Sequence, residues 1–404
     1  MEIISSPPAL TRADDNLQAS MISLLGDLVR VPSRAGVDSY EDIFGCIAGW
    51  LKRHDLPCTR LRGVDGRIIA LSGDLGASAE QRMIVLNAPV DTAGFGDLAA
   101  WTKHPTSAEI ADRYLYGRGS ADSKAGISVF CHLLARFRSR GFAKAIGFVF
   151  DGDEHTGQFK GIRTYLDQSR NRIGCVLIGY PGHEHVGIGA RGFWRGTLHV
   201  SGAAAHSGSS HDRGVNAIAK AARLVRLVED LQETLPPDAA RDFPLPPKFT
   251  VTAISGGGEF SAVPDGCVIE LDVRLTPAYP AEGAVARVQA LLEQIDRQFP
   301  SPRPSRILKQ QSIPAYRLSA TGWPAAALAR AGHQVLRRSL ALKIMGPSNI
   351  GNVLAEWGIP ATCGFGVAYR NIHAADECIE IDSLLPTLRV YEAAVQELLN
   401  NTTS

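Results

Sequence analysis

The chain has 404 residues, a length that favours two domains or one large domain with an insertion. Its 45% hydrophobic and 21% charged residues are typical of a globular protein with a full core. The net charge is +1 and no Lys/Arg run exists, so composition gives no electrostatic reason to expect nucleic acid or an anionic membrane as a partner. No apolar run approaches the ~20 residues of a membrane span.

The start of the chain lacks the basic segment and apolar core of a secretory signal. The seven cysteines are scattered, and none has the Cys-x-x-Cys spacing of a zinc site. Most of them have apolar neighbours in the sequence, as reduced buried thiols do. We therefore expect a cytoplasmic protein.

The first half of the chain alternates helical patterns with short, continuous apolar runs. Helices are expected at 18–31, 41–54 and 123–138, and strands at 67–71, 83–87, 145–150 and 175–179. Continuous apolar strands separated by helices predict an α/β sheet that is covered on both faces.

The pattern changes after Gly189, where apolar and polar residues alternate as in a half-exposed strand. Strands are expected at 193–201, 249–254 and 267–275, with helices at 214–231 and 284–299 and a Pro-rich stretch at 300–304. The α/β pattern then resumes with helices at 323–340, 350–357 and 381–399 and strands at 342–345 and 361–365. We predict a catalytic domain formed by residues 1–190 and 312–404, interrupted by an α+β domain of residues 191–311.

Four side chains in predicted loops could bind a metal or act beside it. Asp122 lies on a glycine-rich turn before a helix, Glu154 and His155 follow the strand at 145–150, and His373 lies near the C-terminus. Carboxylate and imidazole groups suit zinc and similar ions, and three protein ligands plus water are usual for catalytic zinc. Glu154 is placed to act as a general base. Taken alone, the same loops are equally explained as solvated turns.

An ordered set of motifs is more specific. It comprises Tyr116-Gly-Arg-Gly-x-x-Asp122-x-Lys124, Asp153-Glu154-x-x-Gly157, Gly202-Ala-Ala-Ala-His206-Ser, Gly214-Val-Asn216-Ala, Val263-Pro264-Asp265, Asp272-Val-Arg274 and His373-x-x-x-Glu377. Together these motifs resemble the zinc-dependent amidohydrolase family of aminoacylase, acetylornithine deacetylase, succinyl-diaminopimelate desuccinylase and carboxypeptidase G. The resemblance implies a phosphorylase/hydrolase-like catalytic domain with an inserted ferredoxin-like lid that is often used for dimerisation.

The resemblance also implies roles for individual residues. Asp122, His155 and His373 would bind the metal, although His155 stands where the family usually has a Glu ligand. Glu154 would be the general base, and His206 would reach into the active site of a partner subunit to stabilise an oxyanion.

Four further residues match substrate-binding positions of the family. Arg274 would grip a substrate carboxylate through its fork of N–H groups, and Arg191, Ser348 and Asn349 would line the same region. Arg274 also fits an ordinary surface ion pair, and Arg191 also fits an interdomain charge without a substrate contact.

The chain departs from the family at one of its two metal sites. Pro89 stands where the family has a zinc-binding His, and Tyr180 stands where it has a carboxylate ligand. Both losses fall on the same metal, so we predict a single-metal site. Asp91, which we count with Glu154 and His206 among the catalytic residues, would orient a ligand. His183 or His185 could supply a replacement ligand, although a solvated loop explains them better.

These features predict metal-dependent hydrolysis of an amide bond in a small N-acyl amino acid or dipeptide-like substrate bearing a carboxylate. One divalent metal per chain is expected, with Zn²⁺ first and cobalt, manganese and iron as alternatives. The expected assembly is a homodimer formed through the lid. Two other hypotheses remain at this stage: a non-hydrolytic acyl transfer, synthesis or lyase reaction on the same scaffold, and a non-catalytic carboxylate-binding homologue.

Overall fold

The computed structural model describes residues 11–76, 81–141, 145–234 and 243–401. The chain divides into two compact units. The first comprises Met1–Ile188, Leu318–Lys343 and Trp357–Ser404, and the second comprises Gly189–Arg317 and Ile344–Glu356. The second unit is therefore inserted into the first along the chain. The domain limits of 1–190, 191–311 and 312–404 stay a prediction.

The first unit is built on a six-stranded mixed sheet. Its order is β1 (Thr59–Arg62), β2 (Ile68–Asp74), β6 (Ile146–Asp151), β3 (Met83–Pro89), β7 (Ile173–Ile178) and β15 (Ala361–Thr362). Strands β6, β3, β7 and β15 run parallel, whereas β1 and β2 are antiparallel additions at one edge. Every residue of β3, β6 and β7 is buried, which explains their continuous apolar sequences.

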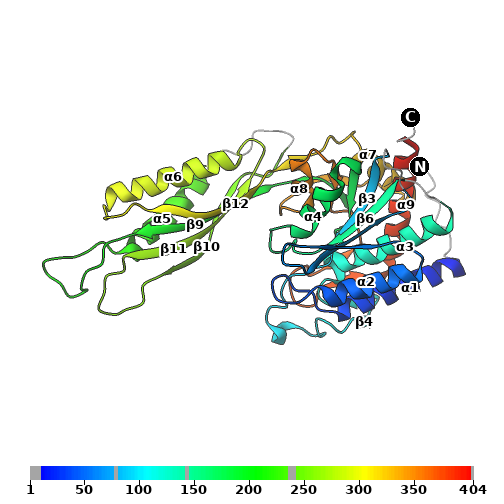
Figure 1. The fold of residues 1–404 in the computed structure, drawn as a ribbon, viewed down its shortest axis with the longest axis horizontal. Helices are drawn as coiled ribbons and strands as arrows, with labels where there is room; N and C mark the ends of the chain where they lie inside the picture. The colour runs from blue at the N-terminus through cyan, green and yellow to red at the C-terminus, as the bar shows by residue number, and fades with distance from the viewer. Residues whose placement is uncertain (1–10, 77–80, 142–144, 235–242, 402–404) are drawn as a thin grey trace, which may run out of the picture. The chain divides into compact units, whose positions relative to one another are not determined.

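Helices cover both faces of this sheet, as Figure 1 shows with α1, α2 and α3 below the strands and α4 on the other side. The helices of this unit are α1 (Arg12–Arg30), α2 (Glu41–Arg53), α3 (Ala125–Ser139), α4 (Lys160–Ser169), α7 (Ala325–Leu336) and α9 (Leu384–Asn401), with short turns η1 (Leu98–Ala100), η2 (Ser120–Lys124), η3 (Arg170–Arg172) and η4 (Ile381–Ser383). Helices α3 and α9 pack against β3 and against each other. None of the described helices is long and apolar enough to span a membrane.

A second, smaller sheet in this unit joins segments that are far apart in the sequence. It has the order β16 (Tyr369–Arg370), β17 (Cys378–Glu380), β5 (Tyr114–Tyr116) and β4 (Ile110–Ala111), and all of its pairs are antiparallel. Because β17 pairs with β5, the segment before β17 lies beside the glycine-rich turn that follows β5.

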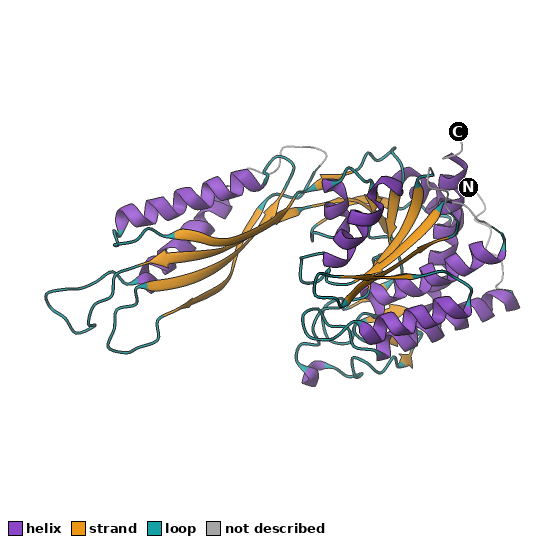
Figure 2. Ribbon diagram, viewed as in Figure 1, coloured by secondary structure: helices purple, strands orange, loops and turns teal. Residues whose placement is uncertain are grey.

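The second unit contains a four-stranded antiparallel sheet with two helices on one face (Figure 2). Along the chain its elements are β9 (Gly192–Ser201), α5 (Ala217–Thr234), β10 (Lys248–Gly256), β11 (Gly266–Leu275), α6 (Ala281–Gln298) and β12 (Arg306–Ile313), followed by α8 (Ile350–Glu356). The spatial order β10-β11-β9-β12 is that of a ferredoxin-like βαββαβ unit. Inward-facing residues of the sheet and of both helices form one apolar core. The predicted ferredoxin-like fold is confirmed.

Three short strands complete the structure. β13 (Tyr316–Arg317), β8 (His185–Ala190) and β14 (Ala341–Met345) form a sheet in the order β13-β8-β14. The chain passes from one unit to the other within β8 and within β14.

Most of the predicted elements are present, with corrected limits. The helix expected from residue 123 begins at Ala125, because residues Ser120–Lys124 form the separate turn η2. The helix expected from residue 214 begins at Ala217, where the Asn216 side chain accepts a hydrogen bond from the Ala219 N–H. Sequence patterns missed several elements, chiefly α4, β1 and β12.

Candidate active site

Three neighbouring parallel strands of the large sheet place side chains at one edge. Asp91 follows β3, Glu154 and His155 follow β6, and Tyr180 follows β7. The carboxyl ends of parallel strands meet at one edge, which is the usual location of binding sites in α/β sheets.

The small sheet supplies the other two predicted metal ligands. Asp122 lies in the turn η2 after β5, and His373 lies in the loop between β16 and β17. The strands that precede these two residues belong to the small sheet, whereas the strand that precedes His155 belongs to the large one. Gly119 before the turn has a φ of 80°, and a Cβ atom there would overlap Thr92, so glycine lets the turn lie against the loop that carries Asp91.

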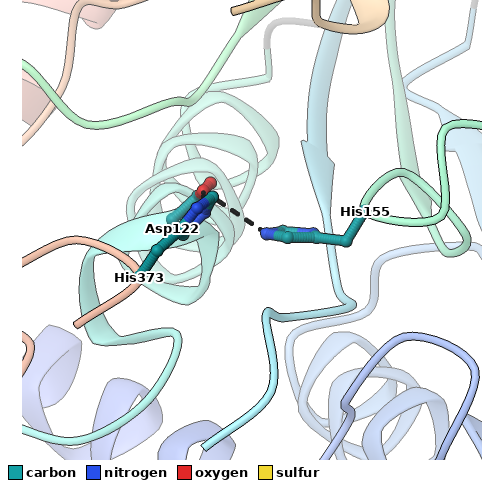
Figure 3. A group of neighbouring side chains, drawn as sticks. All are labelled: Asp122, His155 and His373. Atoms are coloured by element: carbon teal, nitrogen blue, oxygen red, sulfur yellow. Dashed lines mark hydrogen bonds and ion pairs between the residues drawn. The ribbon is translucent and has the colours of Figure 1, made fainter. Parts of the chain in front are cut away.

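The structure brings Asp122, His155 and His373 together. One possible ligand atom from each lies within 4.8 Å of the other two. The Nε2 atom of His373 is 3.0 Å from Asp122 Oδ2, and the Nε2 atom of His155 is 3.5 Å from the same oxygen. Figure 3 shows the His155 ring pointing toward the other two side chains.

This arrangement fits a divalent cation. Both ring nitrogens of His155 are buried and make no hydrogen bond, although carboxylate oxygens lie 3.1 to 3.5 Å away. Buried polar atoms without a partner are costly, and a metal ion would satisfy Nε2, the His155 nitrogen that faces Asp122. One carboxylate and two imidazoles form a donor set that matches catalytic zinc sites.

Ionisation in the metal-free cluster reflects its mixture of charges. Burial would raise the pKa of Asp122, but the nearby imidazole of His155 and the hydrogen bond to His373 lower it below its usual range. Burial would lower the pKa of His155, but the charge of Glu154 and contacts with Asp122 and Asp91 raise it well above its ordinary value. The His155 ring is therefore held as an imidazolium ion when no metal is bound.

Asp91 organises the loop that carries Glu154 and His155. Its fully buried carboxylate accepts hydrogen bonds from the N–H of Glu154 at 3.1 Å and of His155 at 2.9 Å. The same carboxylate lies 3.5 Å from His155 Nδ1. Asp91 therefore fixes the loop backbone and contacts the side of the imidazole opposite Asp122.

Glu154 is held at both carboxylate oxygens. Tyr180 donates a hydrogen bond of 3.0 Å to Oε1, and His155 Nδ1 lies 3.1 Å from Oε2. Burial raises the pKa of Glu154 to about 7, an effect opposed by the charge of His155 and reinforced by Asp122 and Asp91. A carboxylate with a pKa near neutrality is suited to general-base catalysis.

Sequence reasoning placed Glu377 in a motif without giving it a role. Its buried carboxylate accepts hydrogen bonds from the N–H groups of Ala121 and Asp122 at 3.0 and 3.2 Å. It also forms a buried ion pair of 2.5 Å with Arg118. Arg118 in turn donates to the carbonyl groups of Gly94 and Ala374. The only sequence signal for this support was the presence of both residues in the motifs.

The positions assigned to a second metal contain no replacement ligand set among the described residues. Pro89 ends the buried strand β3, and Tyr180 contacts Glu154. His183 Nδ1 lies 3.0 Å from the Gly366 carbonyl oxygen, and its ring stacks on Phe365. Within the described segments, Asp122, His155 and His373 form the single group of this kind.

Three of the four predicted substrate-binding residues, Arg274, Arg191 and Ser348, lie together in the second unit. Arg274 Nη1 lies 3.4 Å from Ser348 Oγ, which donates to the Arg191 carbonyl oxygen at 2.8 Å. Burial and the charge of Arg274 lower the pKa of Arg191. Arg274 also pairs with Asp272 at 2.9 Å, an ion pair of the kind that the alternative hypothesis for this residue expects.

Asn349 and His206 have different surroundings in that unit. The Asn349 side chain is buried and accepts a hydrogen bond from the Gly351 N–H at the start of α8. His206 is exposed, on a loop that is bridged to Ala262. Neither residue contacts the pair of arginines in the hydrogen bonds of the described residues.

Comparison with known proteins points to one family. Residues 188–300 match the peptidase dimerisation domain of M20 enzymes. The succinyl-diaminopimelate desuccinylase of Rhodospirillum centenum is 25% identical over 395 residues, covering 93% of this chain and 96% of the relative. That of Cupriavidus taiwanensis is 28% identical, covering 79% and 82%. These matches support the M20 amidohydrolase and metallopeptidase family for this chain. They likewise support a metal-dependent amidohydrolase or peptidase.

Solved structures support the same fold. The M20 metallo-carboxypeptidase of Sulfolobus solfataricus superimposes with a TM-score of 0.74 at 15% identity, covering 93% of this chain and 98% of that one. Human carnosine dipeptidase 1 superimposes with a TM-score of 0.75 at 15% identity, covering 98% and 100%. The M20 fold, with an α/β catalytic part and an inserted ferredoxin-like part, is the fold predicted from the motifs.

Proposed function

We propose that this protein uses a single divalent metal ion, most simply Zn²⁺, to hydrolyse an amide bond in a small N-acyl amino acid or dipeptide-like substrate. The observation that carries the proposal is the cluster of Asp122, His155 and His373, in which the buried nitrogens of His155 have no hydrogen-bond partner. Pro89 and Tyr180, at the positions of the second metal in the family, support a count of one.

Asp122, His155 and His373 would hold the metal in this proposal. A bound divalent ion would polarise the substrate carbonyl and make water more acidic. Asp91 and Glu377 support the ligands from behind, through the loop of His155 and the turn of Asp122.

Glu154 would move the proton. Its pKa of about 7 lets it accept a proton from the attacking water and then donate that proton to the leaving amine. The carbon–nitrogen bond breaks as the amine gains this proton, so the water supplies both the hydroxyl of the new acid and the hydrogen of the amine.

Arg274 and Arg191 would bind the substrate carboxylate. The Arg274 guanidinium lies beside the Ser348 hydroxyl and its charge acts on Arg191, so the two arginines form a region that favours an anion. Asp272 neutralises part of this charge. His206 would stabilise the oxyanion from a partner subunit, and a homodimer would form through the second unit, a proposal supported by the matched dimerisation domain.

The test combines metal content with turnover. Protein purified without added metal is analysed for metal per chain, and hydrolysis is measured on N-acetyl and N-succinyl amino acids and on dipeptides. The panel includes N-succinyl substrates because the relatives are named as desuccinylases. We expect about one equivalent of metal, and we expect Glu154→Gln to lose turnover by about 10³-fold or more while keeping the metal. The exposed Glu229→Gln serves as the control.

Two results would overturn the proposal. Two tightly bound metals per chain would show that Pro89 and Tyr180 do not abolish the second site. A metal-loaded protein whose rate on any panel member is unaffected by Glu154→Gln would remove the hydrolytic mechanism.

A further inference from the structure

We infer that Tyr180 is a positioning residue for the proposed general base, and that its hydroxyl holds the Glu154 carboxylate in its working orientation. The inference rests on the proposed hydrolytic function. Tyr180 lies two residues beyond β7, is 9% exposed, and donates a hydrogen bond of 3.0 Å to Glu154 Oε1.

The backbone that carries Tyr180 is tightly enclosed. A Cβ atom at Gly126, in the first turn of α3, would overlap the Gly179 carbonyl oxygen. A Cβ atom at Gly366 would overlap the carbonyl oxygen of Tyr180 itself. Glycine at these two positions allows close contact from both sides, so the phenol is presented by a backbone with little freedom to move.

Glu154 is held at both carboxylate oxygens and at its backbone. Its Oε1 atom accepts from Tyr180, its Oε2 atom lies 3.1 Å from His155 Nδ1, and its backbone N–H donates to Asp91. Removal of the Tyr180 hydroxyl would leave Oε1 without this hydrogen bond, and the Glu154 side chain is only 11% exposed to water that could replace it. The carboxylate could then rotate about its side-chain torsions, and its proton-accepting oxygen would spend less time in the productive position.

The type of residue at position 180 is consistent with a single metal. By resemblance, the family has a carboxylate ligand of the second metal at the position that Tyr180 occupies here. A carboxylate at this distance from Glu154 would repel it unless a cation lay between the two groups. A phenol hydroxyl in the same place donates a hydrogen bond and attracts Glu154. The replacement therefore converts a contact that needs a second cation into one that does not.

The test is Tyr180→Phe, which removes one hydroxyl and keeps the ring. On the best substrate of the panel we expect kcat to fall roughly 10- to 100-fold, the usual effect of losing a hydrogen bond to a charged group. We expect KM and the metal content to stay within about 2-fold of wild type, since the change removes a hydrogen bond to Glu154 and leaves the proposed ligands and the arginines in place.

Tyr391→Phe is the matched control. Its buried hydroxyl bonds to the carbonyl groups of Ile178 and Phe365, so it also stabilises the end of β7 without touching Glu154. This variant should lose stability and retain kcat. A comparable loss of kcat in both variants would mean that Tyr180 acts only by supporting the strand.

A double-mutant cycle with Glu154→Gln separates positioning from other roles. If Tyr180 acts through Glu154, Tyr180→Phe should change the residual rate of Glu154→Gln by less than about 2-fold. An equal fold-loss in both backgrounds overturns the inference, and so does an unchanged kcat for Tyr180→Phe in the otherwise wild-type enzyme. If the wild-type protein hydrolyses no amide, the proposed function itself fails, which is a distinct outcome.

Discussion

Glu377 accepts a hydrogen bond of 3.2 Å from the backbone N–H of Asp122 while its other oxygen pairs with Arg118. The carboxylate of a candidate ligand is thus positioned by a second carboxylate 255 residues away in the sequence. We predict that Glu377→Gln lowers metal affinity by about 10- to 100-fold, because supporting residues orient ligands. The measurement is a metal titration in competition with a chelator.

The same substitution should also reduce stability, by about 3 kcal/mol, because it leaves the buried Arg118 without its ion pair. Urea unfolding of the metal-free protein measures this loss. Glu397→Gln, which breaks the exposed pair with Arg330, is the control and should change neither quantity appreciably. Normal metal affinity in a destabilised Glu377→Gln protein would contradict the positioning role.

Metal binding should release protons. The pKa of His155 is raised in the metal-free site by Glu154 and Asp122, so the ring carries a proton that a metal must displace. The affinity should therefore rise with pH through the neutral range, by up to about tenfold per pH unit for each proton released. Calorimetry at one pH in two buffers of different ionisation enthalpy counts the protons. Heats that do not depend on the buffer would contradict this prediction.

Asp151 should make the folded protein less stable as pH rises. Burial raises its pKa well above the ordinary value, with the charges of Asp91 and Glu154 adding to the effect against a hydrogen bond from Asn87. Stability from this group is full below the pKa of the unfolded carboxyl, about 3.9, and is lost as pH rises toward the folded value.

Asp151→Asn should remove this loss of stability at higher pH, because an amide does not ionise. We expect the free energy of unfolding of the variant, relative to wild type, to improve steadily between pH 4 and pH 8, while the exposed Asp27→Asn control shows no such trend. A constant difference across this range would mean that Asp151 does not titrate with a raised pKa.

Restoring the two lost ligands should restore a second metal. Pro89→His together with Tyr180→Glu replaces both residues with the types found in the family, and we expect metal content to rise from about one to about two equivalents. Each single variant should remain near one, because one new ligand beside Asp122 is not enough. A double variant with one metal would indicate that further residues closed the second site.

Arg274 should control recognition of the substrate carboxylate. Arg274→Lys replaces a planar fork with a point charge, and KM for carboxylate substrates should rise about 10- to 100-fold with a smaller change in kcat. Arg195→Lys is a matched control, because Arg195 pairs with the other oxygen of the same Asp272. Similar KM values for both variants would assign Arg274 to the ion pair alone.

The motifs in the sequence single out the candidate ligands Asp122, His155 and His373 but not the residues that support them. The structure brings these three side chains within 4.8 Å of one another. The pairing of Glu377 with Arg118 joins residues 259 positions apart and depends on the match of β17 with β5, which no local pattern encodes. Strand β12 was missed because it is an exposed, largely polar edge strand that gives no apolar alternation.

Likewise, the resemblance to the family predicts that Tyr180 stands in place of a carboxylate ligand, but only the structure shows the hydrogen bond that it makes to Glu154. From the sequence alone, tyrosine at position 180 shows only that a carboxylate is absent. Its contact with Glu154 depends on how the ends of β7 and β6 meet at one edge of the sheet.

The hydrogen bond between Asp122 and His373 spans 251 residues, and it joins parts of the chain on either side of the whole inserted unit. Closing so long a loop is slow and entropically costly, so these ligands should meet late in folding. A chain emerging from the ribosome has made Asp122 and His155 long before His373. Metal should therefore bind only after synthesis has passed the inserted unit, and it would then join the two ends of the first unit as a final cross-link.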